Sequence, residues 1–321
     1  MQDSLWFSRY FDSGAGALIK VELPGIGFGY ADCHPWPELG DLSLERQLKL
    51  LAEGVMTPLT CCSMRFAQMD AEARSAGKSC FNDIKIPTSH FLVIDIKNLS
   101  GSLSGSLISR LSERGFKQIK VKTGRDLKHE SMVIKQIHKK LLSRGIGLRL
   151  DFNSRISFKE CICFIEELGE AISIVDFIED PIPYDQEKWA ELSKMSGIRL
   201  AADNWRDSSD GVPDAASVLV WKPAVIERNR AYDFFSRRNG KLVVTSYLDH
   251  PLGQVCAAYE AAVLAAAHPE RMEICGLLSH LVYEQNEFSE QLEVSAARLI
   301  PPEGLGFGFD ECLQRLNWKK L

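Results

Sequence analysis

The chain has 321 residues, of which 45% are hydrophobic and 25% charged, a composition typical of an ordinary globular protein. Its net charge of -5 gives no basis for electrostatic binding to nucleic acid or to anionic membranes. The longest apolar run, Cys256 to Ala267, is too short to span a bilayer. We therefore expect a cytoplasmic protein that acts on small molecules, with no nucleic-acid partner and no membrane insertion.

The nine cysteines match no zinc-binding spacing, and no basic-then-apolar secretory signal precedes them. Most of them are therefore expected to be reduced, small and buried hydrophobic side chains.

Residues 1 to about 85 have the pattern of an α+β domain, and we place its boundary at 1–88. Ala17–Val21 and Gly25–Tyr30 are predicted to form a hairpin around the Pro24–Gly25 turn. One helix is predicted to begin after Ser43, and a second to run from Pro58 to Ala76. Strands followed by helices are typical of α+β folds.

From His90 the pattern changes to alternating strands and helices, which predicts parallel β/α units over residues 89–280. The expected strands are Phe91–Ile96, Gln118–Lys122, Leu148–Asp151, Val175–Glu179, Arg199–Asp203, Val218–Lys222, Lys241–Ser246 and Glu273–Leu277. Seven or eight such units favour an α/β fold, a modified TIM-type (β/α)7β barrel with the N-terminal α+β domain as a cap. A doubly wound open sheet is the alternative, but its G-x-G-x-x-G fingerprint follows no early strand.

The C-terminal residues 281–321 return to a glycine-rich pattern. Gly304–Phe309 echoes Gly25–Tyr30 closely. We expect this segment to pack back on the N-terminal domain, where it would pair with the similar strand.

Three successive strands end in carboxylates, namely Asp151, Glu179 and Asp203. In a parallel barrel such ends converge at the mouth where active sites are built. Crowded carboxylates repel one another unless a cation neutralises them, and all-oxygen ligands suit Mg²⁺, for which Mn²⁺ can substitute. Each carboxylate could instead pair with a nearby lysine or arginine, or cap the next helix. Asn153 points to the same face as Asp151 and would steady the site.

Lysines lie on either side of these carboxylates. Lys120 and Lys122 are two residues apart on one strand, so both project to the same side, while Lys222 ends a strand beyond the carboxylates. Two close ammonium groups are expected to lower a lysine pKa toward the range of a general base. A small-molecule carboxylate held on the metal would thus have a lysine on each face. Lys120 alone could equally be a lysine whose head reaches solvent.

Together these residues resemble the enolase superfamily, and within it the muconate-lactonizing-enzyme subgroup. Lys120-Val121-Lys122 matches the family's K-x-K motif, Asp151-Phe152-Asn153 its D-x-N stretch, and Glu179-Asp180-Pro181 its E-E-P or E-Q-P stretch. Asp203 and Lys222 match the aspartate and lysine of the fifth and sixth strands. The resemblance implies that Asp151, Glu179 and Asp203 bind Mg²⁺, that Lys122 is the acid/base, and that Lys222 and Lys120 assist.

Within that subgroup the chain is most similar to the short o-succinylbenzoate synthases of menaquinone biosynthesis. The similarity lies in its compact length, the Leu148–Arg155 run and the Gly29–Pro35 run. It implies a hydro-lyase that removes water from 2-succinyl-6-hydroxy-2,4-cyclohexadiene-1-carboxylate. The residues that would bind the substrate are Arg149, Asn153, Thr245, Ser246, Tyr247 and Gly276.

The chain departs from the family pattern at three places. Asp180 replaces a glutamate, Asn204 follows Asp203 where glutamate is common, and Tyr247 and His250 fall in a run that is usually richer in serine.

Other reactions on the same site remain alternatives. N-acyl amino acid racemases and dipeptide epimerases would use Lys122 and Lys222 as two bases, although Ile274–Ser279 lacks the paired acids of the epimerases. A Schiff-base aldolase acting through Lys222 is a more distant alternative, and a non-catalytic binding barrel is a third. The sequence does not specify an oligomer and is compatible with a monomer.

Overall fold

The computed structural model describes residues 4–10, 16–101, 103–203, 205, 214–237 and 240–321. Its N-terminal part is an antiparallel sheet of order β13-β1-β2-β3. The strands are β1 (Leu5–Tyr10), β2 (Gly16–Leu23), β3 (Gly27–Cys33) and β13 (Lys319–Lys320). The predicted hairpin is confirmed as β2 and β3, whereas β1 was not foreseen.

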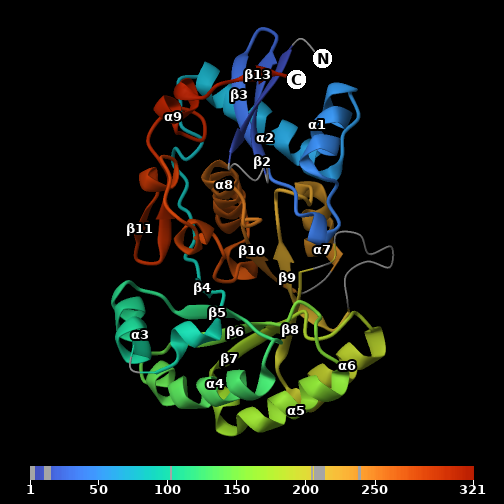
Figure 1. Ribbon diagram of the computed structural model, residues 1–321, viewed down its shortest axis with the longest axis vertical. Helices are drawn as coiled ribbons and strands as arrows, with labels where there is room; N and C mark the ends of the chain where they lie inside the picture. The colour runs from blue at the N-terminus through green and yellow to red at the C-terminus, as the bar shows by residue number, and fades with distance from the viewer. Residues whose placement is uncertain (1–3, 11–15, 102, 204, 206–213, 238–239) are drawn as a thin grey trace.

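Two helices pack on this sheet, as predicted, and they begin where the capping residues indicate. Ser43 and Thr57 accept hydrogen bonds at the first turns of α1 (Leu44–Ala52) and α2 (Pro58–Ser75). Helix α2 lies so close to β3 that a Cβ on Gly29 would stand 1.8 Å from the Ala67 carbonyl oxygen. We call β1–β3, α1 and α2 the cap; Figure 1 shows it in blue at one end of the molecule.

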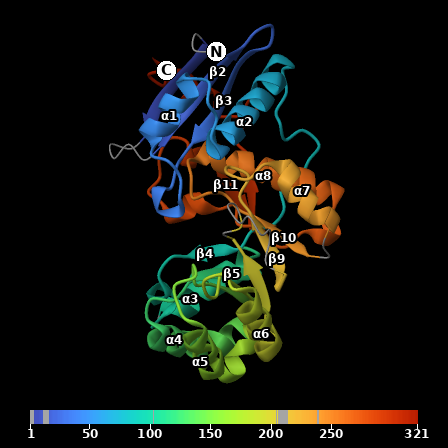
Figure 2. The ribbon, with the colours of Figure 1, turned by 90° about the vertical axis from the view of Figure 1, so that its right-hand side faces the viewer.

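The second part is a seven-stranded, all-parallel sheet in the described residues, with the order β10-β9-β8-β7-β6-β5-β4. The strands are β4 (Phe91–Val93), β5 (Gln118–Lys122), β6 (Gly147–Asp151), β7 (Val175–Glu179), β8 (Arg199–Ala202), β9 (Ala216–Trp221) and β10 (Lys241–Val244). The helices are α3 (Leu103–Glu113), α4 (Leu127–Leu142), α5 (Phe158–Leu168), α6 (Gln186–Ser196), α7 (Arg228–Arg237) and α8 (Pro251–Ala267). Helices α3 to α6 cover the outer face of the curled sheet (Figure 2).

Residues 273–277 occupy the eighth strand position and join the two edges of the sheet. The His90 amide donates to the Cys275 carbonyl at 2.8 Å, and the Gly276 amide donates to the Val244 carbonyl at 2.9 Å. The expected full strand is replaced by isolated bridges to Ser89 and Thr245. The predicted (β/α)7β barrel with an N-terminal α+β cap is confirmed.

The first barrel strand is shorter than predicted. It ends at Val93, and the chain then turns into a 3-10 helix, Ile96–Leu99, whose first turn is capped by Asp95. Asp95 accepts from the Lys97 amide at 2.9 Å, which offers the backbone an alternative to the strand. Other 3-10 turns are Pro37–Leu39, Gly169–Ile174, Pro269–Arg271, Ser279–Val282 and Ser289–Gln291.

Side chains alternate between two faces along the barrel strands. The outward residues, such as Ile119, Leu150 and Leu200, belong to the main core that packs against the helices. The inward residues of the lower barrel form a separate small cluster of Phe177, Ala201, Val218, Val220 and Val243. The inward residues one step further along the strands are polar, and they form the site described below.

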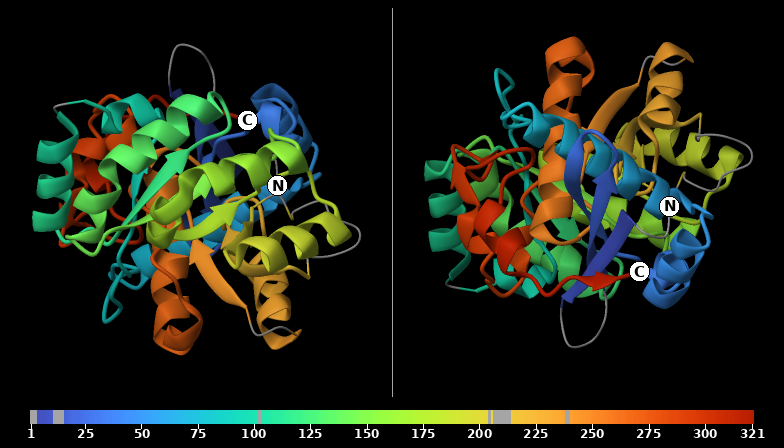
Figure 3. Two further views of the ribbon diagram at one scale, coloured as in Figure 1. Left: turned by 90° about the horizontal axis from the view of Figure 1, so that it is seen from below. Right: turned by 90° about the horizontal axis from the view of Figure 1, so that it is seen from above.

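The C-terminal segment returns to the cap, but by different contacts from those expected. After the hairpin of β11 (Glu293–Ser295) and β12 (Arg298–Ile300), Gly306 bridges to Ser79, and α9 (Asp310–Arg315) leads to β13. It is β13 that pairs with the sheet, beside β1, so the expected pairing of Gly304–Phe309 with β3 is wrong. Figure 3 shows this red segment beside the blue sheet in the view from above.

All nine cysteines are free, and six of them, Cys33, Cys62, Cys161, Cys256, Cys275 and Cys312, are buried, as expected. Within the described ranges, none of the helices has the length and hydrophobicity needed to cross a membrane.

Candidate active site

The strand register brings the predicted charges to one end of the barrel. Lys122 lies opposite Asp151, which in turn lies opposite Glu179. Asp203 and Lys222 directly follow β8 and β9. Because alternate residues of a strand share a face, Lys120 points to the same interior as Lys122.

The lysines and carboxylates are paired with one another. Lys120 Nζ lies 2.8 Å from Asp151 Oδ2 and 2.6 Å from Glu179 Oε1. Lys122 Nζ donates to Asp151 Oδ2 at 2.6 Å, and Lys222 Nζ donates to Asp203 Oδ2 at 2.5 Å. The pairing with lysines that the sequence left as an alternative is therefore present at all three carboxylates.

These contacts change the expected proton affinities. Burial alone would lower the pKa of Lys120, but the charges of Asp151 and Glu179 outweigh it and raise that pKa above its usual value. The expectation that paired ammonium groups lower a lysine pKa is thus wrong for Lys120, because its nearest neighbours are carboxylates. Burial would raise the pKa of Asp151, yet Lys120 and Lys122 hold it well below its usual range.

The other carboxyl groups of the site, those of Glu179, Asp180 and Asp203, are less well compensated by positive charge than that of Asp151. Burial, followed by the charge of Asp151, raises the pKa of Glu179 to about 7. Burial and the charge of Asp203 raise the pKa of Asp180 well above its usual value. Among the described residues, Asp203 Oδ1 is buried and has no hydrogen-bond partner. A buried carboxylate oxygen without a donor is costly unless a cation meets it.

The donor set of Asp151, Glu179 and Asp203 suits a hard divalent cation, since all its atoms are carboxylate oxygens. Asp203 Oδ1 has no hydrogen-bond partner among the described residues. The raised pKa of Glu179 indicates that an additional positive charge here would be favourable. As the side chains stand, no three His, Cys, Asp or Glu groups of the described chain converge closely enough to hold an ion. The residues therefore fit a divalent metal once their carboxylates turn from the lysines toward it.

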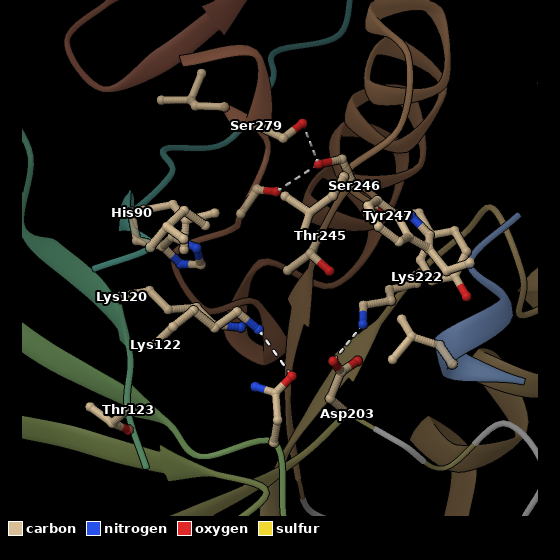
Figure 4. A pocket seen from close by; sticks show the side chains of 18 of the residues that line it. His90, Lys120, Lys122, Thr123, Asp203, Lys222, Thr245, Ser246, Tyr247 and Ser279 are labelled. Carbon is tan, nitrogen blue, oxygen red and sulfur yellow. Dashed lines mark hydrogen bonds and ion pairs between the residues drawn. The ribbon is translucent and has the colours of Figure 1, made fainter. Parts of the chain in front are cut away.

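A cavity of about 350 Å³ opens above these charges. Its lining includes Lys120, Lys122, Asp203, Lys222 and Asn153. Figure 4 shows Lys120 and Lys122 entering from one side of the cavity and Lys222 from the other. A ligand in this space would therefore have an ammonium group on each side.

Most of the predicted substrate-binding residues reach this cavity. Thr245, Ser246, Tyr247 and Gly276 line it, and Ser246 Oγ donates to Ser279 Oγ at 2.8 Å. Arg149 does not reach it: the side chain is fully buried one layer deeper, where it pairs with Asp176 at 2.9 Å.

The residues that differ from the family pattern do not all lie at the cavity. Asp180 Oδ1 accepts the Asp203 amide at 3.0 Å, so it holds the backbone of that carboxylate. His250 caps the first turn of α8 through Leu252 and does not line this cavity. Asn204 lies outside the described residues.

Several lining residues escaped the sequence interpretation. Arg125 and Arg155 follow β5 and β6 by only a few residues, a signal that could have been used. His90, which precedes the first barrel strand, had no motif around it.

The loop that joins β3 to α1 within the cap supplies part of the wall, through Trp36, Glu38 and Leu39. Trp36 Nε1 donates to the Tyr247 carbonyl at 2.7 Å. The Trp36 amide and the Tyr247 hydroxyl both donate to Asp41 Oδ2 at 2.8 Å. This network ties the cap loop to the residues that follow β10.

The architecture is that of muconate-lactonizing enzymes. A solved muconate lactonizing enzyme from Pseudomonas putida superposes with a TM-score of 0.74 at 15% identity, covering 98% of this chain and 97% of that one. A solved dipeptide epimerase from Enterococcus faecalis gives a TM-score of 0.73 at 15% identity, over 95% and 98% of the two chains. The barrel and cap therefore define an enolase-like fold.

The sequence comparisons are more specific. Residues 8–73 match the model of the o-succinylbenzoate synthase N-terminal domain, and residues 105–216 that of the enolase C-terminal domain-like family. An o-succinylbenzoate synthase of Bdellovibrio bacteriovorus is 35% identical over 311 residues, which cover 95% of this chain and 91% of the relative. The chain belongs to the o-succinylbenzoate synthase family of the enolase superfamily.

A second relative matches only part of the chain. An L-amino acid-D/L-Glu epimerase of Francisella philomiragia is 31% identical over 115 residues, 35% of this chain and 32% of that protein.

Proposed function

We propose that the chain is a cytoplasmic o-succinylbenzoate synthase of menaquinone biosynthesis. It would remove water from 2-succinyl-6-hydroxy-2,4-cyclohexadiene-1-carboxylate, so that one C–H and one C–O bond break and a double bond forms. The observation that carries the proposal is the 35% identity to such an enzyme over 95% of the chain. The opposed lysines of the cavity support it, because the reaction needs a base on one face of the ring.

Lys122 would take the proton from the carbon beside the substrate carboxylate and return it to the departing hydroxyl. Its Nζ lies within hydrogen-bond reach of Asp151 and Asn153, at 2.6 and 3.4 Å, so these two side chains would position the amino group, which would act as the base in its neutral form. Lys222 would stabilise the developing negative charge from the other side. Lys120, which bridges the oxygens of Asp151 and Glu179, would keep a positive charge beside the site.

Asp151, Glu179 and Asp203 would hold the divalent ion, for which we propose Mg²⁺, with Mn²⁺ as a substitute. When bound, such an ion stabilises negative charge on the substrate carboxylate and so makes the adjacent carbon more acidic, the general pattern of enolase-superfamily sites with a lysine base. We further propose that residues 1–88 together with 281–321 form the unit that closes over the barrel, residues 89–280.

Racemisation or epimerisation on the same site is the second candidate, and the partial match to the epimerases favours it to that extent. The two reactions differ in what they require of Lys222. In the elimination it needs only its positive charge, whereas in a two-base reaction it must exchange a proton.

The test is turnover of the cyclohexadiene substrate with Mg²⁺ and with EDTA, for the wild type and for Lys122→Ala. We expect metal-dependent product, and a loss of about 10²- to 10⁴-fold in kcat without the base. Lys128→Ala, at an exposed position of α4, is the matched control and should behave as the wild type. Absence of product, with metal-dependent α-proton exchange in N-succinyl amino acids, would contradict the elimination.

Lys222 separates the two candidates. Lys222→Arg keeps the charge and should retain more elimination activity than Lys222→Ala. If both variants are equally inactive while one-sided proton exchange through Lys122 persists, the two-base reaction is favoured instead.

A further inference from the structure

His90 is a buried histidine in the cavity wall that the proposed chemistry leaves without a task. It directly precedes β4, and its amide donates to the Cys275 carbonyl at 2.8 Å, which ties it to the eighth strand position. The residue is only 5% exposed, yet it lines the cavity beside the lysines. Figure 4 shows the His90 ring in the cavity wall, near the side chains of Lys120 and Thr245.

Arg149 determines which ring nitrogen of His90 carries the proton. Arg149 Nη1 lies 3.2 Å from His90 Nδ1. A guanidinium group has donors and no acceptor, so Nδ1 must offer its lone pair. In a neutral imidazole the other nitrogen then bears the hydrogen, which makes Nε2 a donor.

The guanidinium group is itself fixed. Its Nε donates to Asp176 at 2.9 Å, and its Nη1 donates to the Ile274 carbonyl at 2.5 Å. Its central carbon lies 4.6 Å from the centre of the Phe177 ring. A buried arginine held on several sides cannot turn away from His90 without breaking these contacts.

His90 is held in its neutral form by its surroundings. Burial is the largest cause, and the positive charges of Arg149 and Lys120 add to it, so that its pKa lies well below the usual value. Asp151 acts in the opposite direction but does not outweigh them. The ring therefore offers one hydrogen-bond donor, at Nε2.

Thr245 is a second cavity-lining residue close to the donor edge of His90. A Cβ built on Gly276 would stand 2.9 Å from His90 Nε2 and 2.7 Å from Thr245 Cγ2, so the glycine keeps both side chains at one place in the wall. In the described part of the chain, Thr245 Oγ1 is buried and has no hydrogen-bond partner. The methyl group of Thr245, rather than this hydroxyl, lies beside the Gly276 position, so the Nε2–H group of His90 is the donor at this place in the wall.

We propose that the Nε2–H group of His90 donates a hydrogen bond to an oxygen of the substrate, and that Arg149 is the positioning residue that fixes the imidazole tautomer. The oxygen belongs to a carboxylate or carbonyl group remote from the reacting carbon. The carboxylate at that carbon would instead bind the divalent ion that Asp151, Glu179 and Asp203 are proposed to hold. The identity of the substrate rests on the proposed function, whereas the donor at His90 does not.

Two variants of His90 separate a binding role from a structural one. Asparagine can place an acceptor near the Nδ1 position, and so satisfy Arg149, but it has no donor that reaches the Nε2 position. Glutamine is longer and can place its amide donor there. His90→Asn should therefore raise KM by about 10- to 100-fold, the effect of losing one hydrogen bond to a charged group, with a smaller change in kcat. His90→Gln should recover most of the affinity.

A measurement without turnover tests the same donor independently. Protein labelled with ¹⁵N-histidine, with the His90 signals assigned from the His90→Gln variant, should show the Nε2–H tautomer at neutral pH. Succinate, used as a carboxylate probe, should shift the Nε2 signal of the wild type, and it should bind His90→Asn more weakly.

The outcomes are distinct for the two proposals. An Nδ1–H or doubly protonated ring, or a KM of His90→Asn equal to that of the wild type, overturns the role of His90. If the cyclohexadiene is not turned over but succinate shifts Nε2, the proposed function fails and the carboxylate-binding donor stands.

Discussion

Asp32→Asn alters a pair of buried carboxyl groups where the cap meets the barrel. Asp32, on β3, is 9% exposed, and Asp249, after β10, is 7% exposed. The Tyr10 hydroxyl donates to Asp32 Oδ1 at 2.6 Å and the His250 amide to Oδ2 at 3.1 Å. A Cβ on Gly253 would stand 2.6 Å from Asp32 Oδ2 and 2.7 Å from Asp249 Oδ2, so the two carboxyl groups share one small space. Two buried carboxyl groups this close do not both ionise readily.

The sign of the pH effect follows from the pKa values. Burial is the main cause that raises the pKa of Asp32 from 3.8 to about 7, and burial and the charge of Asp32 raise the pKa of Asp249. The folded state thus binds the proton more tightly than the unfolded state. Its contribution to stability is complete below about pH 4 and is lost as the pH rises through 7. At about 1.4 kcal/mol per pKa unit, the loss for Asp32 is on the order of 4 kcal/mol.

Buried histidines act in the opposite direction, so the wild-type curve alone does not isolate Asp32. Burial lowers the pKa of His34 to about 4 and that of His250 to about 3. These rings contribute stability that grows as the pH rises from their folded pKa values to about 6.5. The difference between wild type and variant at each pH removes this shared background.

Urea unfolding of the wild type and Asp32→Asn at pH 4.5, 6 and 8 measures that difference. At pH 4.5 the variant should be less stable by about 1 kcal/mol, because an amide nitrogen cannot accept from the His250 backbone. Between pH 4.5 and 8 the difference should move in favour of the variant by roughly 2–4 kcal/mol. Glu166→Gln, at an exposed position of α5, should show no such change. A difference between wild type and Asp32→Asn that is independent of pH would refute the reasoning.

Two further substitutions test how the cap is held. Gly29→Ala would place its Cβ 1.8 Å from the Ala67 carbonyl, a backbone atom that cannot move aside, so thermal unfolding should show a loss of at least about 3 kcal/mol or failure to fold. Glu260→Gln should cost about 3 kcal/mol in urea unfolding, because the buried Glu260 accepts from Arg65 of the cap at 2.5 Å and from Arg228 at 2.8 Å. An unchanged midpoint for either variant would contradict the packing or the charge argument, respectively.

The sequence was sufficient to predict the charged end of the barrel. An apolar strand buried on both faces needs no charge inside it, so a charge at its last position marks the mouth of the barrel. Lys122, Asp151 and Glu179 each end a strand, and the parallel register then places them side by side. Asp203 and Lys222 fall one residue beyond their strands, which is within the uncertainty of any strand boundary.

The alternation of side chains along β6 predicted that Arg149 points into the barrel, but not how far below the cavity it lies. Arg149 and Asp151 share a face, yet two residues of strand separate their levels by about 6.6 Å. At the lower level the guanidinium group meets Asp176, which is on the neighbouring strand β7, and it contacts the cavity-lining His90. Those partners depend on how strands are staggered, which residue spacing does not specify.

The contribution of the cap to the cavity is the part that no local pattern could reveal. Trp36 reaches the wall because its indole donates to the Tyr247 carbonyl, a residue 211 positions away in the chain. Trp36 follows Asp32 by four residues, and Asp249 follows Tyr247 by two, so the buried carboxyl pair and the wall contact belong to the same junction. Ionisation of Asp32 should weaken that junction, and the position of Trp36 over the cavity then depends on the same proton that stabilises the cap.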